Sequence, residues 1–208
     1  GVQHNIPFQT NFKMFKHLSV SVGGQYTETW TGKTIRYNNY NEGVGAVKDT
    51  IGGFDRFGVY NYSASITTKV YGIVNFKPKN KVQSIRHTIS PSISYSNSPS
   101  FEKYYDTYII DANGNTAEYT RFQGGLYNAP GKNYSSSIGL SIKNVIEAKV
   151  KPKDSTETEL RKIDIFKNLN ITTSYNLAAE EFNLSPIRVS GSFDIKKGFT
   201  VNTGATFD

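Results

Sequence analysis

Apolar and polar side chains alternate at every second position between residues 59 and 76, which read VYNYSASITTKVYGIVNF. Successive Cβ atoms of a β-strand point to opposite faces of a sheet, so this period predicts a strand with one apolar and one polar face. The alternation continues far beyond the about 5–6 residues of an ordinary strand. About 9–11 residues are enough for a strand to cross a bilayer. The pattern therefore predicts a strand that is long enough to span a membrane.

The same alternation recurs along the chain and predicts about eight strands. They fall near residues 6–14, 18–31, 58–76, 84–96, 134–150, 163–177, 186–195 and 199–208. Strands that follow one another without helical crossovers pair antiparallel as a meander. The connections alternate between tight turns and large loops, and in one large loop residues 104–110 and 116–122 flank Asn113-Gly114. This dipeptide predicts a hairpin that is closed by a type I′ turn.

Two all-β architectures produce such strands. A soluble sandwich buries its apolar face against a second sheet, whereas a transmembrane barrel turns that face to lipid and the polar face to its lumen. Strand length, the scarcity of charge in the polar rows and the aromatic residues near strand ends favour the barrel. The candidate lipid-facing residues are then Tyr60, Tyr62, Ile66, Val70, Val74, Ile138, Leu140 and Ile142, and the candidate lumen-facing residues are Asn61, Ser63, Ser65, Thr67 and Lys69.

The predicted fold is thus an antiparallel transmembrane β-barrel, of which residues 1–208 form a single segment. A sheet that faces lipid must close, because an open edge would leave backbone groups without hydrogen bonds in hydrocarbon. Eight strands can close alone or within a larger barrel. The chain starts and stops in mid-pattern and has no initial Met, so we expect a piece of a longer, processed protein and a larger barrel.

Composition removes several classes of function. The chain has 208 residues, 37% of them hydrophobic, and lacks an apolar run that could form a membrane helix. It has no cysteine, and its histidines, His4, His17 and His87, are far apart, so we expect neither a metal site nor a cofactor. The residues show no catalytic arrangement. The net charge of +7 gathers in the tight turns and does not form an aromatic-interleaved strand face, which argues against nucleic acid.

The segment 84–101, SIRHTISPSISYSNSPSF, carries a spaced motif of Arg86, His87, Pro91 and Tyr95. Pro91 lies in mid-strand and cannot donate a ladder hydrogen bond, so it predicts a bulge or weakened pairing. The motif, followed by Pro99 and Phe101, resembles the LptD family of outer-membrane lipopolysaccharide-assembly proteins, particularly its Bacteroidetes-type branch. Further similar segments are YYDTYIIDANGNTAEYTRFQGGLY (104–127), NLNITTSYNLAAEEFNLSPIRVSG (168–191) and the closing VNTGATFD.

This resemblance implies transport without catalysis in the outer membrane of a Gram-negative bacterium. LptD-like proteins pass lipopolysaccharide from a periplasmic Lpt bridge to the outer leaflet and hold an LptE-type lipoprotein plug in the barrel. The implied partners are therefore lipopolysaccharide, that plug, the bridge and outer-membrane lipid. Lysines in the tight turns either attract the anionic lipopolysaccharide or are simply solvated. The alternatives are a passive outer-membrane pore or nutrient channel, and a soluble β-sandwich adhesin or carbohydrate-binding module.

Overall fold

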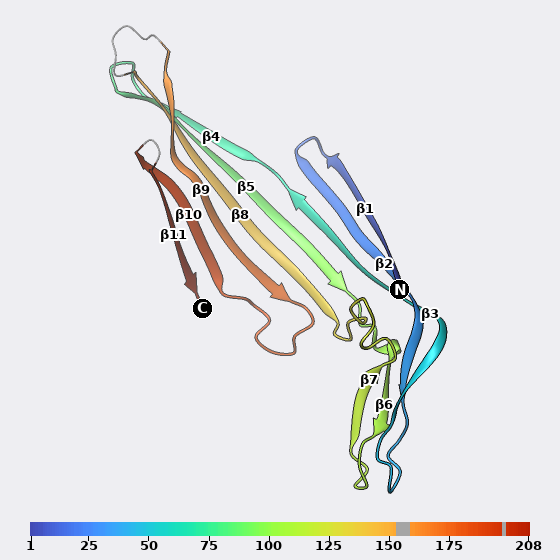
Figure 1. Ribbon diagram of the computed structural model, residues 1–208. Helices are drawn as coiled ribbons and strands as arrows, with labels where there is room; N and C mark the ends of the chain where they lie inside the picture. The colour runs from blue at the N-terminus through green and yellow to red at the C-terminus, as the bar shows by residue number, and fades with distance from the viewer. Residues whose placement is uncertain (153–158, 197–198) are drawn as a thin grey trace. The chain divides into compact units, whose positions relative to one another are not determined.

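The computed structural model describes residues 1–152, 159–196 and 199–208, with backbone alone at 195 and 196. These residues form strands and one short 3-10 helix, η1 (Glu102–Tyr104) (Figure 1). None of the helices in this described part is long and apolar enough to cross a membrane. The strands are β1 (Val2–Met14), β2 (Leu18–Tyr37), β3 (Lys48–Thr67), β4 (Val70–Asn75), β5 (Val82–Ser98), β6 (Tyr105–Ile109), β7 (Thr116–Thr120), β8 (Ser135–Val150), β9 (Arg161–Asn176), β10 (Ile187–Lys196) and β11 (Phe199–Phe207).

Most strands belong to one antiparallel meander. Its order is β1-β2-β3-β5-β8-β9-β10-β11, and β4 also pairs with β5. The strands β6 and β7 form a separate two-stranded sheet. The all-β, antiparallel prediction is confirmed. Among the described residues β1 and β11 do not pair, so the sheet is open and the predicted closed barrel is not observed.

Contacts divide the chain into two compact units. The first comprises Gly1–Thr10, Val22–Ser63 and Ser96–Ser136, and the second Asn11–Ser21, Ala64–Tyr95 and Ser137–Asp208. The first unit has a small aromatic core of buried side chains: Ile35, Phe57, Phe101, Tyr119 and Phe122. In the described part of the second unit, the buried hydrophobic residues are only Val20 and Ala148. The second unit is therefore a sheet without a conventional hydrophobic core.

The predicted hairpin in the large loop is confirmed as β6–β7, and it packs against β2 within the first unit. The Ile35 N–H donates to the Arg121 carbonyl at 2.9 Å. The ring of Tyr37 stacks on Tyr108 with a centroid distance of 4.4 Å, and both rings meet Tyr119 edge to face. Figure 1 shows β6 and β7 alongside the end of β2 and the start of β3. These tyrosine contacts explain why the end of β2 is ordered as a strand.

The turn of this hairpin is not the predicted type I′. Gly114 has a φ of 79°, but Asn113 is not among the residues with positive φ, as a type I′ turn requires. The Asp111 carboxylate instead accepts the backbone N–H groups of Asn113 and Asn115 and the side-chain amide of Asn115. The hydrogen bond from the Asn115 side chain, joined by the backbone ones, holds the pKa of the Asp111 carboxyl below its ordinary value. A carboxylate-centred turn therefore closes the loop.

The predicted strand at 58–76 is in fact two strands. β3 ends at Thr67 and β4 begins at Val70, and Thr68 and Lys69 between them are outside both. The Thr68 N–H donates to the Pro91 carbonyl at 3.2 Å, which places Pro91 opposite the interruption. In a hydrogen-bonded antiparallel pair each residue donates its N–H to the other and accepts with its C=O, and proline lacks the N–H. The weakened pairing predicted for Pro91 is therefore observed, and it breaks the neighbouring strand.

Two other strands extend well beyond their predicted boundaries. The strand predicted at 18–31 continues to Tyr37, and the strand predicted from 58 begins at Lys48. Both additions belong to the part of the first unit that the β6–β7 hairpin supports. At the opposite end of β2, the turn from β1 has positive φ at two bulky residues, 49° at Phe15 and 64° at Lys16. Such backbone angles are costly for residues other than glycine, asparagine and aspartate.

Candidate functional site: the two faces of the sheet

One face of the second unit carries most of its apolar side chains. Residues paired directly in antiparallel strands have side chains on the same face. Ile142 pairs with Ile171, Ile171 with Val189 and Val189 with Ala205, so this row crosses four strands from β8 to β11. We call this the apolar face. By the same registers it includes Ile138, Leu140, Tyr175, Phe193 and Val201, and the β4–β5 register adds the matching set of Val70, Val74, Ile85 and Ile89.

The apolar face is uncovered. Val74 is 59% exposed, Leu140 46% and Phe207 56%, although each is a large hydrophobic residue. In the described part of the second unit no further sheet lies against these strands. A contiguous apolar surface of this kind on a soluble monomer would be unusual, and it marks a surface that contacts lipid or another protein.

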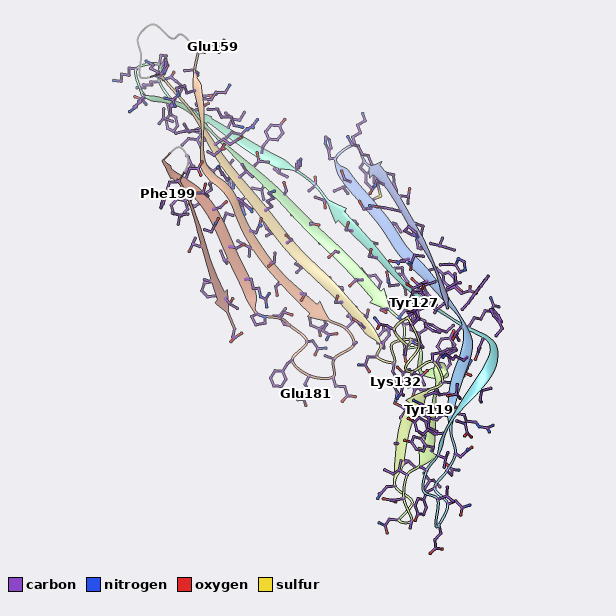
Figure 2. All side chains as sticks on the ribbon, viewed as in Figure 1. Tyr119, Tyr127, Lys132, Glu159, Glu181 and Phe199 are labelled. Atoms are coloured by element: carbon purple, nitrogen blue, oxygen red, sulfur yellow. The ribbon has the colours of Figure 1, made fainter. Side chains whose placement is uncertain are left out.

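The opposite face is built from small polar side chains. Ser141 pairs with Thr172, Asn170 with Ser190, and Ser192 with Asn202. The Thr67 hydroxyl of β3 lies 3.0 Å from the Ser92 hydroxyl of β5. We call this the polar face. Figure 2 shows side chains on both faces of these strands. Hydroxyl and amide groups can hydrogen-bond water or a polar partner without a fixed charge.

The predicted lipid-facing and lumen-facing residues of β3 and β4 alternate along the backbone, as their spacing requires. Tyr60 and Tyr62 belong to the first unit and are 47% and 43% exposed. The Tyr60 ring also meets the buried Phe101 edge to face at 5.6 Å. The other members are exposed except for Ser65 and Thr67, which are half-buried, and Lys69 lies in the interruption between the strands. Their assignment to lipid or lumen stays a prediction.

Arg86 of the motif strand lies on the polar face and reaches across to β8. Its Nε donates to Glu147 Oε2 at 2.7 Å. Glu147 also forms an ion pair with Lys162 of β9, and its side chain is only 10% exposed. A carboxylate that is this well buried needs partners of opposite charge, so the two cations compensate its desolvation. The ion pairs join three strands on one face.

His87, the next residue, lies on the apolar face and also reaches β8. Its Nε2 is 3.0 Å from Asn144 Oδ1, and the Asn144 amide donates to the Leu169 carbonyl at 3.2 Å. Asn144 is only 9% exposed, and these hydrogen bonds within the sheet give its polar atoms the partners that buried polar groups need. The consecutive motif residues thus connect β5 to β8 on opposite faces. Tyr95, the last residue of the motif, is half-buried in β5.

The residues that the sequence analysis missed are Asn144 and Glu147. They flank two register shifts in the β8–β9 pairing, where β9 carries extra residues. Such bulges re-aim side chains and make room for polar contacts. A signal was present, because Lys143, Glu147 and Lys149 interrupt an otherwise uncharged row of polar positions. Their partners could not be inferred, since that required the pairing of β8 with β5.

Two of the basic connections in the second unit lie next to each other. The Lys151 N–H donates to the Lys81 carbonyl at 2.9 Å, which brings the β4–β5 turn next to the end of β8. Lys77, Lys79 and Lys151 are exposed there. Two further turn lysines, Lys153 and Lys197, lie outside the described residues. Within the described ranges no cluster of three or more histidine, aspartate or glutamate side chains could hold a metal ion.

Comparison with known proteins identifies the family. A family model described as LptD protein matches residues 1–208, which is the whole chain. Searches of curated proteins and of solved structures returned no match. The match extends beyond the motif strand to both units, and LptD proteins are outer-membrane proteins that take part in lipopolysaccharide transport. Taken with the all-β sheet of two unlike faces, it establishes that this chain belongs to the LptD family.

Proposed function

We propose that this chain forms part of the wall of an outer-membrane barrel that inserts lipopolysaccharide into the outer leaflet, without catalysis. The observation that carries the proposal is the uncovered apolar face behind a polar face of hydroxyl and amide groups. Family membership supports it, since LptD proteins handle lipopolysaccharide. In this arrangement Leu140 and its row contact lipid, and Ser141 and its row face the interior.

The two faces suit an amphiphilic cargo. The sugar and phosphate groups of lipopolysaccharide need water or polar partners, and burying them without hydrogen bonds would cost several kcal/mol. The acyl chains need apolar surroundings for the same reason that the apolar face does. A wall with one face of each kind separates the two environments across the thickness of a single sheet. The polar face is also the surface on which we place an LptE-type plug.

The basic turns are assigned to the side from which cargo arrives. Lys77, Lys79 and Lys151 are exposed, and an anionic lipid from a periplasmic Lpt bridge would be attracted to them. Exposed charges act mainly on association rates and are screened by salt. We therefore assign them to capture and not to tight binding.

Depletion of the protein in its own cells tests the proposal. Newly made lipopolysaccharide should fail to reach the cell surface, which surface labelling and outer-leaflet extraction would measure. Normal surface delivery after full depletion would refute the proposed function. Restoring the intact protein must restore delivery, whereas restoring an unrelated outer-membrane barrel must not.

The orientation of the wall has its own test, in two adjacent threonines on opposite faces. Thr172 pairs with Ser141 on the polar face, and Thr173 pairs with Leu140 on the apolar face. The chain has no cysteine, so Thr172→Cys and Thr173→Cys would each introduce one thiol into it for a spin label. In vesicles of the intact protein, the label at 173 should be accessible to oxygen from the lipid. The label at 172 should be accessible to a water-soluble nickel chelate, and the reverse result would contradict the assignment.

A passive channel is the second candidate, because charged pairs occur between neighbouring strands. Arg86 and Glu147 join β5 to β8, and Lys167 and Asp194 join β9 to β10 at 2.8 Å. Paired charges of this kind at a lumen surface can select ions. A passive channel predicts steady conductance of the intact protein in a planar bilayer, and normal lipopolysaccharide delivery when the protein is depleted.

A further inference from the structure

The first unit contains a cavity that the two faces of the sheet do not use. Its volume is about 690 Å³. It is lined by the C-terminal half of β2, by residues of β3 and by the segment 121–127 that follows β7. Cavities that bind small ligands span about 300–1,000 Å³, so this one could admit a sugar-sized group. Figure 2 labels Tyr127 on the segment that closes one side.

Aromatic and small polar groups share the walls of this cavity. Trp30, Phe57, Phe122 and Tyr127 supply the aromatic surface. Trp30 is held in place, since its indole N–H donates to Glu28 at 2.7 Å. Gln123 and four threonines also line the cavity: Thr29, Thr31, Thr34 and Thr50. Two of the hydroxyls already have partners, since that of Thr29 accepts from the Gln3 amide and that of Thr31 donates to the Lys33 carbonyl. Aromatic rings beside hydrogen-bonding groups suit a ligand with an apolar face and many hydroxyls, as in a pyranose ring.

The charge of the cavity is positive. Lys33, Lys48 and Arg121 line it, and no aspartate or glutamate does so among the described residues. Arg121 is already paired, with its Nε 2.7 Å from Asp55 Oδ2 and its guanidinium 4.6 Å from the Phe122 ring centroid. Within the described ranges neither lysine ammonium has an ion-pair partner. Two ammonium groups without a counter-ion favour an anionic ligand, and phosphate is an anion that lysine commonly binds.

We propose that this cavity binds a phosphorylated sugar, with Lys33 and Lys48 on the phosphate and Tyr127 beside the sugar ring. The inference rests on the proposed function, because a lipopolysaccharide headgroup presents phosphorylated sugars. It assigns to the first unit a headgroup subsite that is separate from the polar face. A free phosphosugar has the same chemistry, and the experiment distinguishes the two sources.

Calorimetric titration of the intact protein in detergent tests the subsite, with glucosamine 6-phosphate as the probe. It should bind at least about tenfold more tightly than glucosamine or inorganic phosphate, because only the phosphosugar engages both the rings and the lysines. The double variant Lys33→Gln/Lys48→Gln should bind it about tenfold or more weakly. The control variant Lys13→Gln/Lys103→Gln removes the same charge from two exposed lysines that do not line the cavity, and it should bind like the unmodified protein. Equal binding by the two double variants, or equally tight binding of phosphate alone, would overturn the subsite.

Purified lipopolysaccharide in the same titration identifies the source. If it displaces glucosamine 6-phosphate from the unmodified protein, the ligand is a headgroup. If it does not, the headgroup assignment is wrong. Failure of the subsite is distinguishable from failure of the proposed function. Normal surface delivery after depletion would remove the transport role, while full binding by Lys33→Gln/Lys48→Gln in a protein that still delivers lipopolysaccharide would remove only the subsite.

Discussion

A lysine at Leu140 should destabilise the protein in a membrane far more than a lysine at the next residue. Leu140 is on the apolar face opposite Thr173, and Ser141 is on the polar face opposite Thr172. The two positions have nearly the same depth, the same strand and the same neighbouring strand. Leu140→Lys and Ser141→Lys therefore differ chiefly in which face receives the charge.

The magnitude follows from depth. Leu140 lies about five residues inside β8, and a rise of about 3.3 Å per residue with a tilt of about 40° places it roughly 13 Å along the membrane normal. If the strand begins at the membrane boundary, this is near the middle of an apolar band about 25 Å tall. A lysine on the lipid face at that depth costs about 2–4 kcal/mol, whereas a polar-face lysine should cost less than about 1 kcal/mol. Leu140 is already 46% exposed, so little packing is lost in either variant.

Urea unfolding of the intact protein in phosphatidylcholine vesicles measures this difference. The folded fraction can be read from gel migration before and after heating. Leu140→Lys should lower the free energy of unfolding by about 2 kcal/mol more than Ser141→Lys. An equal or larger loss for Ser141→Lys would refute the assignment of the two faces. The conservative variant Leu140→Ile should unfold close to the unmodified protein, which separates the effect of charge from that of any substitution.

Three further changes test local features of the fold. Pro91→Val supplies the missing N–H, so hydrogen exchange should show a protected amide at position 91, and urea unfolding should show a gain of about 0.5–1.5 kcal/mol in unfolding free energy. Phe15→Asn with Lys16→Gly should stabilise the β1–β2 turn by about 1 kcal/mol in the same urea assay, since both residues have positive φ. The lowered pKa of Asp111 means that its stabilisation is complete above the unfolded pKa of about 3.9 and is lost as pH falls through the folded pKa. Exchange protection of β6–β7 should therefore drop in acid, and Asp111→Asn should remove that pH dependence. Protection that does not change with pH in the unmodified protein, or an acid drop that persists in Asp111→Asn, would contradict this cause.

The alternation of apolar and polar residues at every second position was enough to predict most strands and their antiparallel order. It was insufficient where a strand lacks alternation, as in the end of β2, which is held by the Tyr37, Tyr108 and Tyr119 rings of a hairpin distant in sequence. It also missed the interruption at Thr68 and Lys69. That break arises from a proline on the neighbouring strand, and a pattern read along one strand carries no information about its partner.

Only part of the candidate site could be predicted, because a pattern along one strand does not show which strand lies beside it. Which residues share a face follows from spacing, and the registers of β8 to β11 show these rows. The contacts of Arg86 and His87 do not follow from spacing, because they depend on which strand lies beside β5. The cavity of the first unit was also beyond the sequence, since its lysines and rings come from three segments that only the folded chain brings together.

The double attachment of β5 to β8 limits how such a wall could release a lipid sideways. Arg86 pairs with Glu147 on one face and His87 with Asn144 on the other, so separating these strands would remove one of the two cations from a nearly buried carboxylate and a partner from a buried amide oxygen at once. A lateral exit would need a seam that parts at low cost. The contacts on both faces make separation of β5 from β8 unfavourable, and any gate in the complete wall should be sought between other pairs of strands.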